Sequence, residues 1–156
     1  MVKKLPNVNF FCQSVSMPNV TLGIANVGTP FVKLQLPGDH LEYSELLITF
    51  MVDENMVNYI EMYNWMLALG FPESFNQYKA LEDIDSRLNP TGTDQLVSDA
   101  SMFIYNSASN PNVEVKFINL WPSTMSDINF DIRNTDVEYI ECTVSFAFER
   151  YDVIPL

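Results

Sequence analysis

Alternating hydrophobic and polar residues occupy most of the chain and predict β-strands. Residues 137–148 alternate most regularly, and their predicted core face carries Glu138, Ile140, Cys142, Val144, Phe146 and Phe148. Similar but shorter runs predict strands at 8–17, 20–25, 31–36, 41–52, 100–106, 113–119 and 125–132. Segments rich in Pro, Gly, Asn and Asp predict turns or loops between them, at 26–30, 37–39, 106–112 and 134–136.

One segment has the period of an α-helix. Its apolar residues recur three or four positions apart, which predicts a buried stripe formed by Met56, Ile60, Tyr63 and Leu67. Asp53 suits the N-cap position, and Gly70 suits the position just after the last helical residue. The pattern therefore predicts a helix from about residue 54 to residue 69.

These elements predict a mainly β protein with one α-helix. We expect an antiparallel β-barrel or sandwich with the helix packed on its outside. The length of 156 residues suits a single domain, residues 1–156. Within it, Pro72, Pro90 and Gly92 interrupt residues 71–99 and make them an irregular excursion. Leu120-Trp121-Pro122 should end the strand at 113–119, because proline cannot donate a ladder hydrogen bond.

The acidic surface limits the partners that the chain can bind. The net charge is −12, which repels nucleic acid, so DNA is expected only in transit and not as a specifically bound ligand. No apolar run is long enough for a membrane anchor, and no signal-peptide pattern follows Met1, so we expect assembly in a cytoplasm.

The chain carries few groups suited to catalysis. His40 is the only histidine and is expected in an exposed turn, and no phosphate-cradling glycine cluster, nucleophile motif or zinc-ligand pattern occurs. Cys12 and Cys142 lie in predicted strands and are expected to be buried free thiols. We therefore predict a protein that is not an enzyme, without catalytic residues, cofactor or metal. A monomeric β-barrel that binds a small ligand is the competing class.

Three stretches resemble the tail tube proteins of T4-like contractile-tailed phages. The most specific one runs from Ile118-Asn119-Leu120-Trp121-Pro122 through the strand at 137–148 to Tyr151. The others are Pro37-Gly38-Asp39 followed by a long strand and Asp53-Glu54, and Tyr63-Asn64-Trp65 inside the helix. The resemblance is weakest in residues 1–36 and 71–99.

This resemblance implies a structural protein of the virion tail, assembled in the host cytoplasm. It implies stacked hexameric rings that form the inner tail tube, a conduit for DNA during ejection, with tail sheath, tape measure and baseplate proteins as partners. Six copies with four strands each, spaced about 4.8 Å and tilted about 40°, would form a barrel roughly 50 Å across. A tube initiator or cap with the same fold is the alternative.

The resemblance and the composition together predict a contact between subunits at residues 26–39. This short apolar strand is bounded by prolines, and in the family it reaches toward the adjacent ring. We expect an arm or hairpin whose apolar residues dock there, and an ordinary hairpin packed on its own domain is the alternative. Trp121 is expected to anchor a corner against its own domain or a neighbour. The residues predicted at subunit or ring interfaces are Thr29, Pro30, Phe31, Leu34, Pro37, Gly38 and Trp121.

Overall fold

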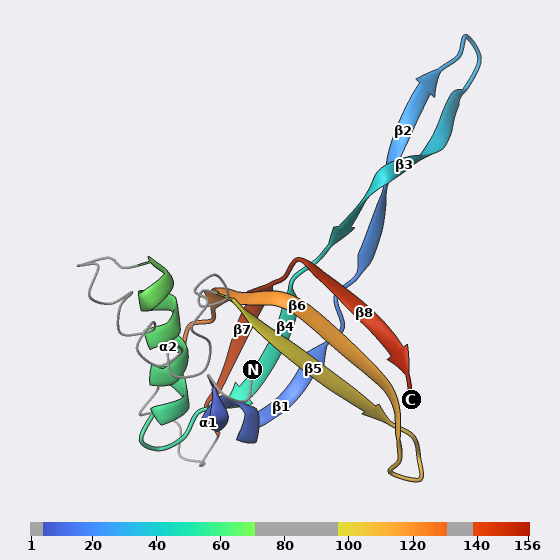
Figure 1. Ribbon diagram of the computed structural model, residues 1–156. Coiled ribbons are helices and arrows are strands. Elements are labelled where there is room, and N and C mark those ends of the chain that lie inside the picture. The colour runs from blue at the N-terminus through green and yellow to red at the C-terminus, as the bar shows by residue number, and fades with distance from the viewer. Residues whose placement is uncertain (1–4, 71–96, 131–138) are drawn as a thin grey trace, which may run out of the picture.

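The structure is a computed structural model that describes residues 5–70, 97–130 and 139–156 (Figure 1). The described part is mainly β, which confirms the predicted fold class. Its helices are α1 Pro6–Phe10 and α2 Val57–Gly70. Its strands are β1 Cys12–Ser16, β2 Val20–Gly28, β3 Lys33–Tyr43, β4 Leu46–Met51, β5 Ser98–Tyr105, β6 Pro111–Met125, β7 Glu141–Ala147 and β8 Arg150–Pro155.

Six strands form one curled antiparallel sheet, a half-barrel, in the order β1-β4-β7-β6-β5, with β8 also paired to β6. The long strand β6 joins the two parts of this sheet. Its first part lies between β5 and β8, and its last residues pair with β7. Asn119 lies between these parts with a φ of 55°. Its N–H donates to a carboxylate oxygen of Asp99 at 3.2 Å and its side-chain amide donates to Glu149 at 2.5 Å, which stabilises the bend.

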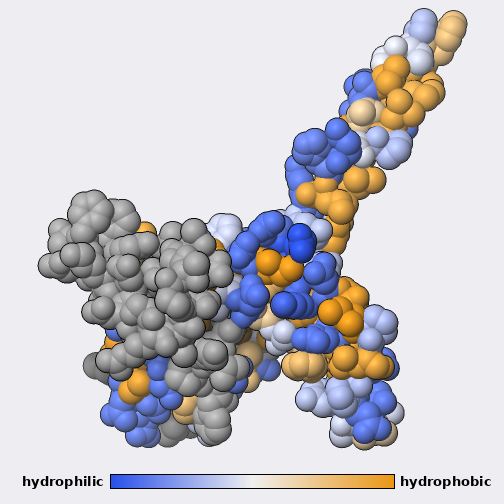
Figure 2. Space-filling view, in the orientation of Figure 1, coloured by the Kyte–Doolittle hydropathy of each residue, from blue (hydrophilic) through white to orange (hydrophobic). Residues whose placement is uncertain are grey.

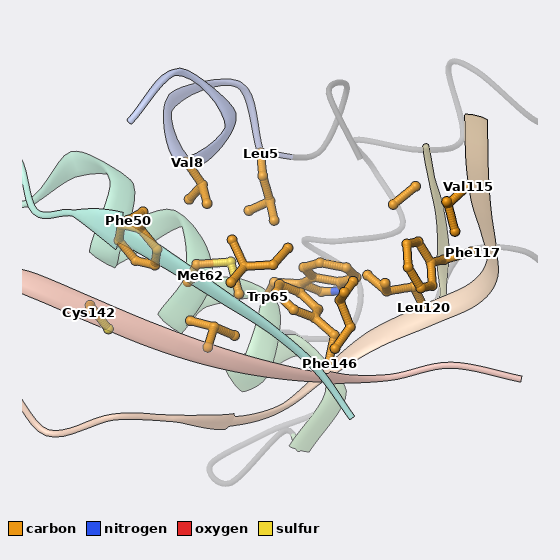
Figure 3. Packing of buried hydrophobic residues seen from close by; sticks show 14 residues of the cluster. Leu5, Val8, Phe50, Met62, Trp65, Val115, Phe117, Leu120, Cys142 and Phe146 are labelled. Carbon is orange, nitrogen blue, oxygen red and sulfur yellow. The ribbon is translucent and has the colours of Figure 1, made fainter. Parts of the chain in front are cut away.

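The core lies between α2 and one face of the sheet (Figure 3). The predicted inward face of the last regular run is confirmed for its described part, since Cys142, Val144 and Phe146 are buried and Phe148 packs against the same cluster. Glu138, predicted on the same face, lies outside the described residues. The remaining buried hydrophobic side chains come from α1 and the residue before it, β4, α2, β5 and β6: Leu5, Val8, Leu46, Ile48, Phe50, Met62, Trp65, Ala68, Ala100, Val115, Phe117 and Leu120.

The predicted buried stripe of the helix is wrong. Ile60 and Tyr63 are about half exposed, and the helix instead buries Asn58, Met62, Trp65 and Ala68. The chain makes a turn before the helix, in which the Met56 N–H donates to the carbonyl oxygen of Asp53 at 2.8 Å. The helix therefore begins at Val57, Asp53 is not its N-cap, and the face that carries Met62 and Trp65 lies against the sheet.

Three further predictions about local structure are wrong. Residues 8–10 belong to α1 rather than to a strand, and residues 37–39, with His40, lie within β3 rather than in a turn. Strand β6 continues through Pro122, which is buried and paired with Phe146. The register shifts immediately after Pro122, so the ladder tolerates its missing N–H at an irregularity. The turn at 134–136 and most of the excursion at 71–99 lie outside the described residues.

Candidate functional site

The candidate functional site is a projecting hairpin that contributes no residue to the hydrophobic core. Among the strands that the structure describes, β2 and β3 pair only with each other, in a two-stranded sheet separate from the six-stranded one. Figure 1 shows this hairpin extending away from the six-stranded sheet. We call residues 20–43 the arm. It is longer than the predicted segment 26–39, because all of residues 20–28 form its first strand.

The turn at the tip of the arm is held by its own hydrogen bonds. The Thr29 N–H donates to the carbonyl oxygen of Val32 at 3.3 Å, and the Val32 N–H donates to the Thr29 hydroxyl at 3.1 Å. Pro30 fixes the backbone between them. Phe31 is 99% exposed, so the turn presents an aromatic ring that no other described residue covers.

The outer half of the arm has one apolar and one polar face. Residues directly opposite each other in an antiparallel pair share a face. One face therefore carries the pairs Ala25–Leu36 and Val27–Leu34, and the other carries Asn26–Gln35 and Gly28–Lys33. Val27, Leu34 and Leu36 are all about half exposed. This half of the arm is thus an amphipathic ribbon whose apolar face is uncovered.

The register of the arm shifts where two glycines meet. Leu22 pairs with Leu41, but Ile24 pairs with Pro37, so Gly23 lies opposite three residues of β3. A Cβ atom on Gly38 would lie 2.5 Å from the carbonyl oxygen of Gly23, which is closer than atoms can approach. Glycine at position 38 therefore permits this irregularity, and the predicted turn at 37–39 is instead a bulge inside the arm.

Aromatic packing attaches the arm to the body. The ring of Tyr43, at the end of β3, lies 5.7 Å from the ring of Phe148 and 5.3 Å from that of Tyr151. Phe117 of β6 completes the cluster, 5.3 Å from Phe148. Just before β2 and just after β3, two hydrogen bonds join the ends of the hairpin. The Asn19 N–H donates to the Ser44 hydroxyl at 2.8 Å, and the Ser44 N–H donates to the carbonyl oxygen of Asn19 at 3.2 Å. The root of the arm is therefore packed while its outer part is exposed.

The seven predicted interface residues fall in two places. Thr29, Pro30, Phe31, Leu34, Pro37 and Gly38 all lie in the arm, and Trp121 lies in β6. Trp121 pairs with Ala147 and is 37% exposed, between the buried residues Leu120 and Pro122. It therefore points to the face of the sheet opposite the core. Leu22, Ile24 and Val27 were not among the predicted interface residues, although Leu22 and Ile24 lie in the strand predicted at 20–25 and Val27 lies in the segment 26–39.

Two other surfaces of the body are also open. Among the described strands, β1 pairs only with β4, while β5 and β8 each pair only with β6, so each has an unpaired edge. The outward side of α2 carries Val57, Ile60 and Tyr63, each nearly half exposed. Exposed edges and apolar surfaces of this kind are sites where further protein chains can bind.

Groups suited to chemistry are sparse in the described residues. Within 5–70, 97–130 and 139–156, no three or more His, Cys, Asp or Glu side chains come together in a way that could hold a metal ion. None of the helices in these ranges has the length and apolar character needed to cross a membrane. Cys142 is a buried free thiol as expected, but Cys12 is exposed, because β1 is an edge strand. The exposed His40 ring is paired with Asp39 at 2.6 Å.

Comparison with known sequences identifies relatives of the whole chain. Residues 2–154 match the family model described as phage tail tube protein. The chain is also 26% identical over 144 residues to the tail tube terminator protein of Enterobacteria phage T4. That alignment covers 90% of this chain and 75% of the T4 protein.

Comparison with solved structures finds the same fold in contractile injection systems. The tube-terminating cap of the anti-feeding prophage has a TM-score of 0.60 at 13% identity, over 93% of this chain and 80% of that one. The six-fold symmetrised baseplate of the same prophage gives 0.58 at 13% identity, with coverages of 92% and 80%. The sheath/tube terminator of an extracellular contractile injection system, PVC, gives 0.56 at 14% identity, with coverages of 92% and 84%.

Proposed function

The chain belongs to the phage tail tube protein family, and from this membership we propose that it is the terminator that closes one end of the inner tube of a contractile tail. The observation that carries this proposal is the 26% identity to the tail tube terminator protein of phage T4 over 90% of the chain. The fold shared with a tube-terminating cap and a tube terminator supports it.

At a coarser level, the chain is a tube-associated structural protein of a contractile tail. Membership of this family points to a structural rather than a catalytic role, and to the virion tail as its location. The acidic surface is consistent with that role, because a net charge of −12 disfavours retention of DNA. The family also favours this role over that of a monomeric barrel that binds a small ligand.

The unpaired strand edges support assembly into a ring. An open sheet edge exposes N–H and C=O groups that pair with another strand. In the proposed ring, the free edges of β1, β5 and β8 meet edges of neighbouring copies, so that half-barrels join into one wall. We propose six copies per ring, in line with the six-fold symmetry applied to the related baseplate. Sheath, tape measure and baseplate proteins are its proposed neighbours.

A repeating subunit of the inner tube is the second candidate. The family model that matches residues 2–154 is described as a tail tube protein, not specifically as a terminator. A tube subunit must bind a copy of itself on both faces of its ring. A terminator must bind the tube on one face and a different structure, or none, on the other. The two candidates therefore differ in the number of rings per tail.

Deletion of the gene in the phage that encodes it distinguishes these candidates. If the protein is a terminator, electron microscopy should show tubes that still form but lack a defined end or are not joined to heads. Quantitative mass spectrometry of wild-type tails should then give one ring of copies per tail. Absence of any tube in the deletion strain, together with many rings of copies in wild-type tails, would instead identify the repeating tube subunit.

A further inference from the structure

The last strand, β8, has very little side-chain cover. Its six residues pair with β6 along one edge, and its other edge is unpaired among the described strands. Five of its six side chains are exposed, and Tyr151 is the exception. A strand with a free edge and few buried contacts opens easily, because little packing opposes the opening. The order of β8 therefore depends strongly on the contacts of Tyr151.

Tyr151 packs in a cluster of four aromatic rings. Its ring centroid lies 5.3 Å from that of Tyr43, 5.7 Å from that of Phe117 and 6.0 Å from that of Phe148. Tilted and edge-on pairs at such distances are favourable beyond the area that they bury. Phe117 lies in β6 and Phe148 just before β8, whereas Tyr43 is the last residue of β3. One of the three ring partners of Tyr151 thus comes from the arm.

The same ring of Tyr43 holds the base of the arm. Tyr43 lies opposite Val20, where the two strands of the arm begin and end, and its ring also lies 5.7 Å from that of Phe148. Figure 2 shows that the rest of the arm projects clear of the body. A strand of nine residues is about 30 Å long, so a rotation of about 10° at the base would move the tip by about 5 Å. The packing of Tyr43 therefore sets where the tip of the arm lies.

The arm and β8 therefore share one contact. Figure 1 shows the base of the arm beside the turn that leads into β8. A motion of the arm that withdraws Tyr43 removes one of the three ring partners of Tyr151. A motion of β8 that withdraws Tyr151 removes one of the two rings that Tyr43 contacts. The coupling acts in both directions, because the free energy of the same contact is lost in each case.

The centre of the body is held by other contacts. Strands β4 and β7 pair with each other along their whole overlap, from Leu46–Phe146 to Met51–Glu141. Their inward side chains are buried in the core together with Met62 and Trp65 of α2. Loss of the Tyr43 ring should therefore loosen β8 while β4 and β7 stay closed. This difference distinguishes a local coupling from a general loss of stability.

We propose that the contact between Tyr43 and Tyr151 couples the arm to the open edge strand β8, so that fixing the arm orders β8 for pairing with a further strand. Tyr43 acts in this device as a positioning residue. The inference rests on the proposed ring only for the use of the ordered edge, because the coupling itself is a property of a single chain. In the ring, a copy whose arm is held in place pairs its β8 edge more readily.

Amide hydrogen exchange of the purified full-length chain, followed by NMR, tests the coupling. Two amides that flank β8 are suitable probes. The Glu149 N–H donates to the carbonyl oxygen of Ile118 at 3.1 Å, and the Leu156 N–H donates to that of Asn112 at 3.0 Å. Tyr43→Ala should accelerate exchange at both probes roughly three- to tenfold, as expected for the loss of an aromatic contact. Exchange of the amides of β4 and β7 should change by less than about twofold.

Three further variants complete the test. Tyr43→Phe keeps the ring and should leave the exchange of both probes at the rate of the wild type. Phe31→Ala removes a ring at the tip of the arm, where the side chain is 99% exposed, and should likewise leave β8 unchanged. Tyr151→Ala gives the reciprocal result, because it should accelerate exchange of the amides near the base of the arm by a similar factor.

Several results would overturn the inference. They are unchanged exchange at both probes in Tyr43→Ala, equal acceleration in β4 and β7, and an effect of Tyr43→Phe as large as that of Tyr43→Ala. Light scattering then measures the use of the ordered edge. Rings that assemble as well from Tyr43→Ala as from the wild type would refute the role of the coupling in pairing. Coupled exchange in a chain that forms no rings would uphold the coupling and refute the proposed ring.

Discussion

The indole ring of Trp65 packs on the phenyl ring of Phe146, with centroids 6.2 Å apart and planes inclined by 46°. This contact joins α2 to β7 across the core, and both side chains are almost completely buried. Figure 3 shows the two rings together near the middle of the cluster. These two large aromatic side chains thus pack α2 against the sheet, and both belong to the cluster formed by the remaining core residues.

Replacement of Phe146 by alanine should destabilise the fold by about 3–5 kcal/mol, because it leaves a cavity under Trp65. Ile60→Ala is the matched control on the outward side of α2, and it should cost less than about 1 kcal/mol. Urea denaturation measures both values. Equal losses for the two variants would show that α2 packs through a different face.

Asn58 is the buried polar residue of the helix, and it ties the start of α2 to the end of β4. Its side-chain nitrogen donates to the carbonyl oxygen of Met51 at 2.7 Å. Its oxygen accepts from the N–H groups of Asp53 at 3.2 Å and Tyr59 at 2.9 Å. Asn58→Ala should cost about 1–3 kcal/mol, because it leaves buried backbone groups without partners.

Asn58→Asp separates the roles of the two side-chain atoms. It keeps the acceptor but replaces the donor to Met51 with a carboxylate oxygen, so it should be at least as destabilising as alanine at neutral pH. Asn64→Ala, at an exposed position of the same helix, should change stability by less than about 0.5 kcal/mol. Thermal melts followed by circular dichroism provide the comparison. A stable Asn58→Asp variant would contradict the hydrogen-bond assignment.

Substitutions at Asn119 test whether the bend of β6 depends on the backbone conformation of this residue. Its φ of 55° lies in the left-handed region, which glycine adopts freely and β-branched residues avoid. Asn119→Val should therefore cost at least about 1–2 kcal/mol. Asn119→Gly should cost less, since it loses only the side-chain bond to Glu149. If valine is tolerated better than glycine in chemical denaturation, the bend does not depend on this backbone conformation.

The two thiols should react at very different rates. Cys142 is fully buried, and burial raises the pKa of its thiol, although hydrogen bonds with Ser126 partly offset the rise. Desolvation also raises the pKa of the Cys12 thiol, so the difference in rate comes from access, because the Cys142 sulfur is inaccessible in the folded chain. Cys12 is exposed. A thiol reagent should modify one cysteine per native chain quickly, and Cys12→Ser should abolish this fast phase. Loss of the fast phase in Cys142→Ser instead would contradict the structure.

The sequence by itself determined the class of the fold and the face of its most regular strand. Apolar residues occupy every second position from Ile140 to Phe148, and a period of two allows only one assignment of the sides, so Cys142, Val144 and Phe146 were placed correctly. The loop at 106–112 and the existence of the helix followed from equally local signals, because turn residues and helical spacing act within a few positions.

Only the tertiary structure decided which face of the helix is buried. Two overlapping stripes of α2 are apolar, one with Ile60 and Tyr63 and the other with Met62 and Trp65. The short turn at Asp53–Met56 selects between them, since it sets where the helix begins and hence which stripe meets Phe146. Hydrophobic periodicity alone cannot choose between two apolar stripes.

The arm shows the same division between local and long-range information. Apolar alternation in 20–28 and 31–36 indicates strands, but nothing in either strand indicates that the two pair with each other away from the body. Pro37-Gly38-Asp39 has the composition of a turn, and it forms a bulge because Gly23, fifteen positions earlier, lies against Gly38. Residues 37–39 therefore form a bulge because of pairing between distant segments, and the propensities of neighbouring residues carry no information about such a contact.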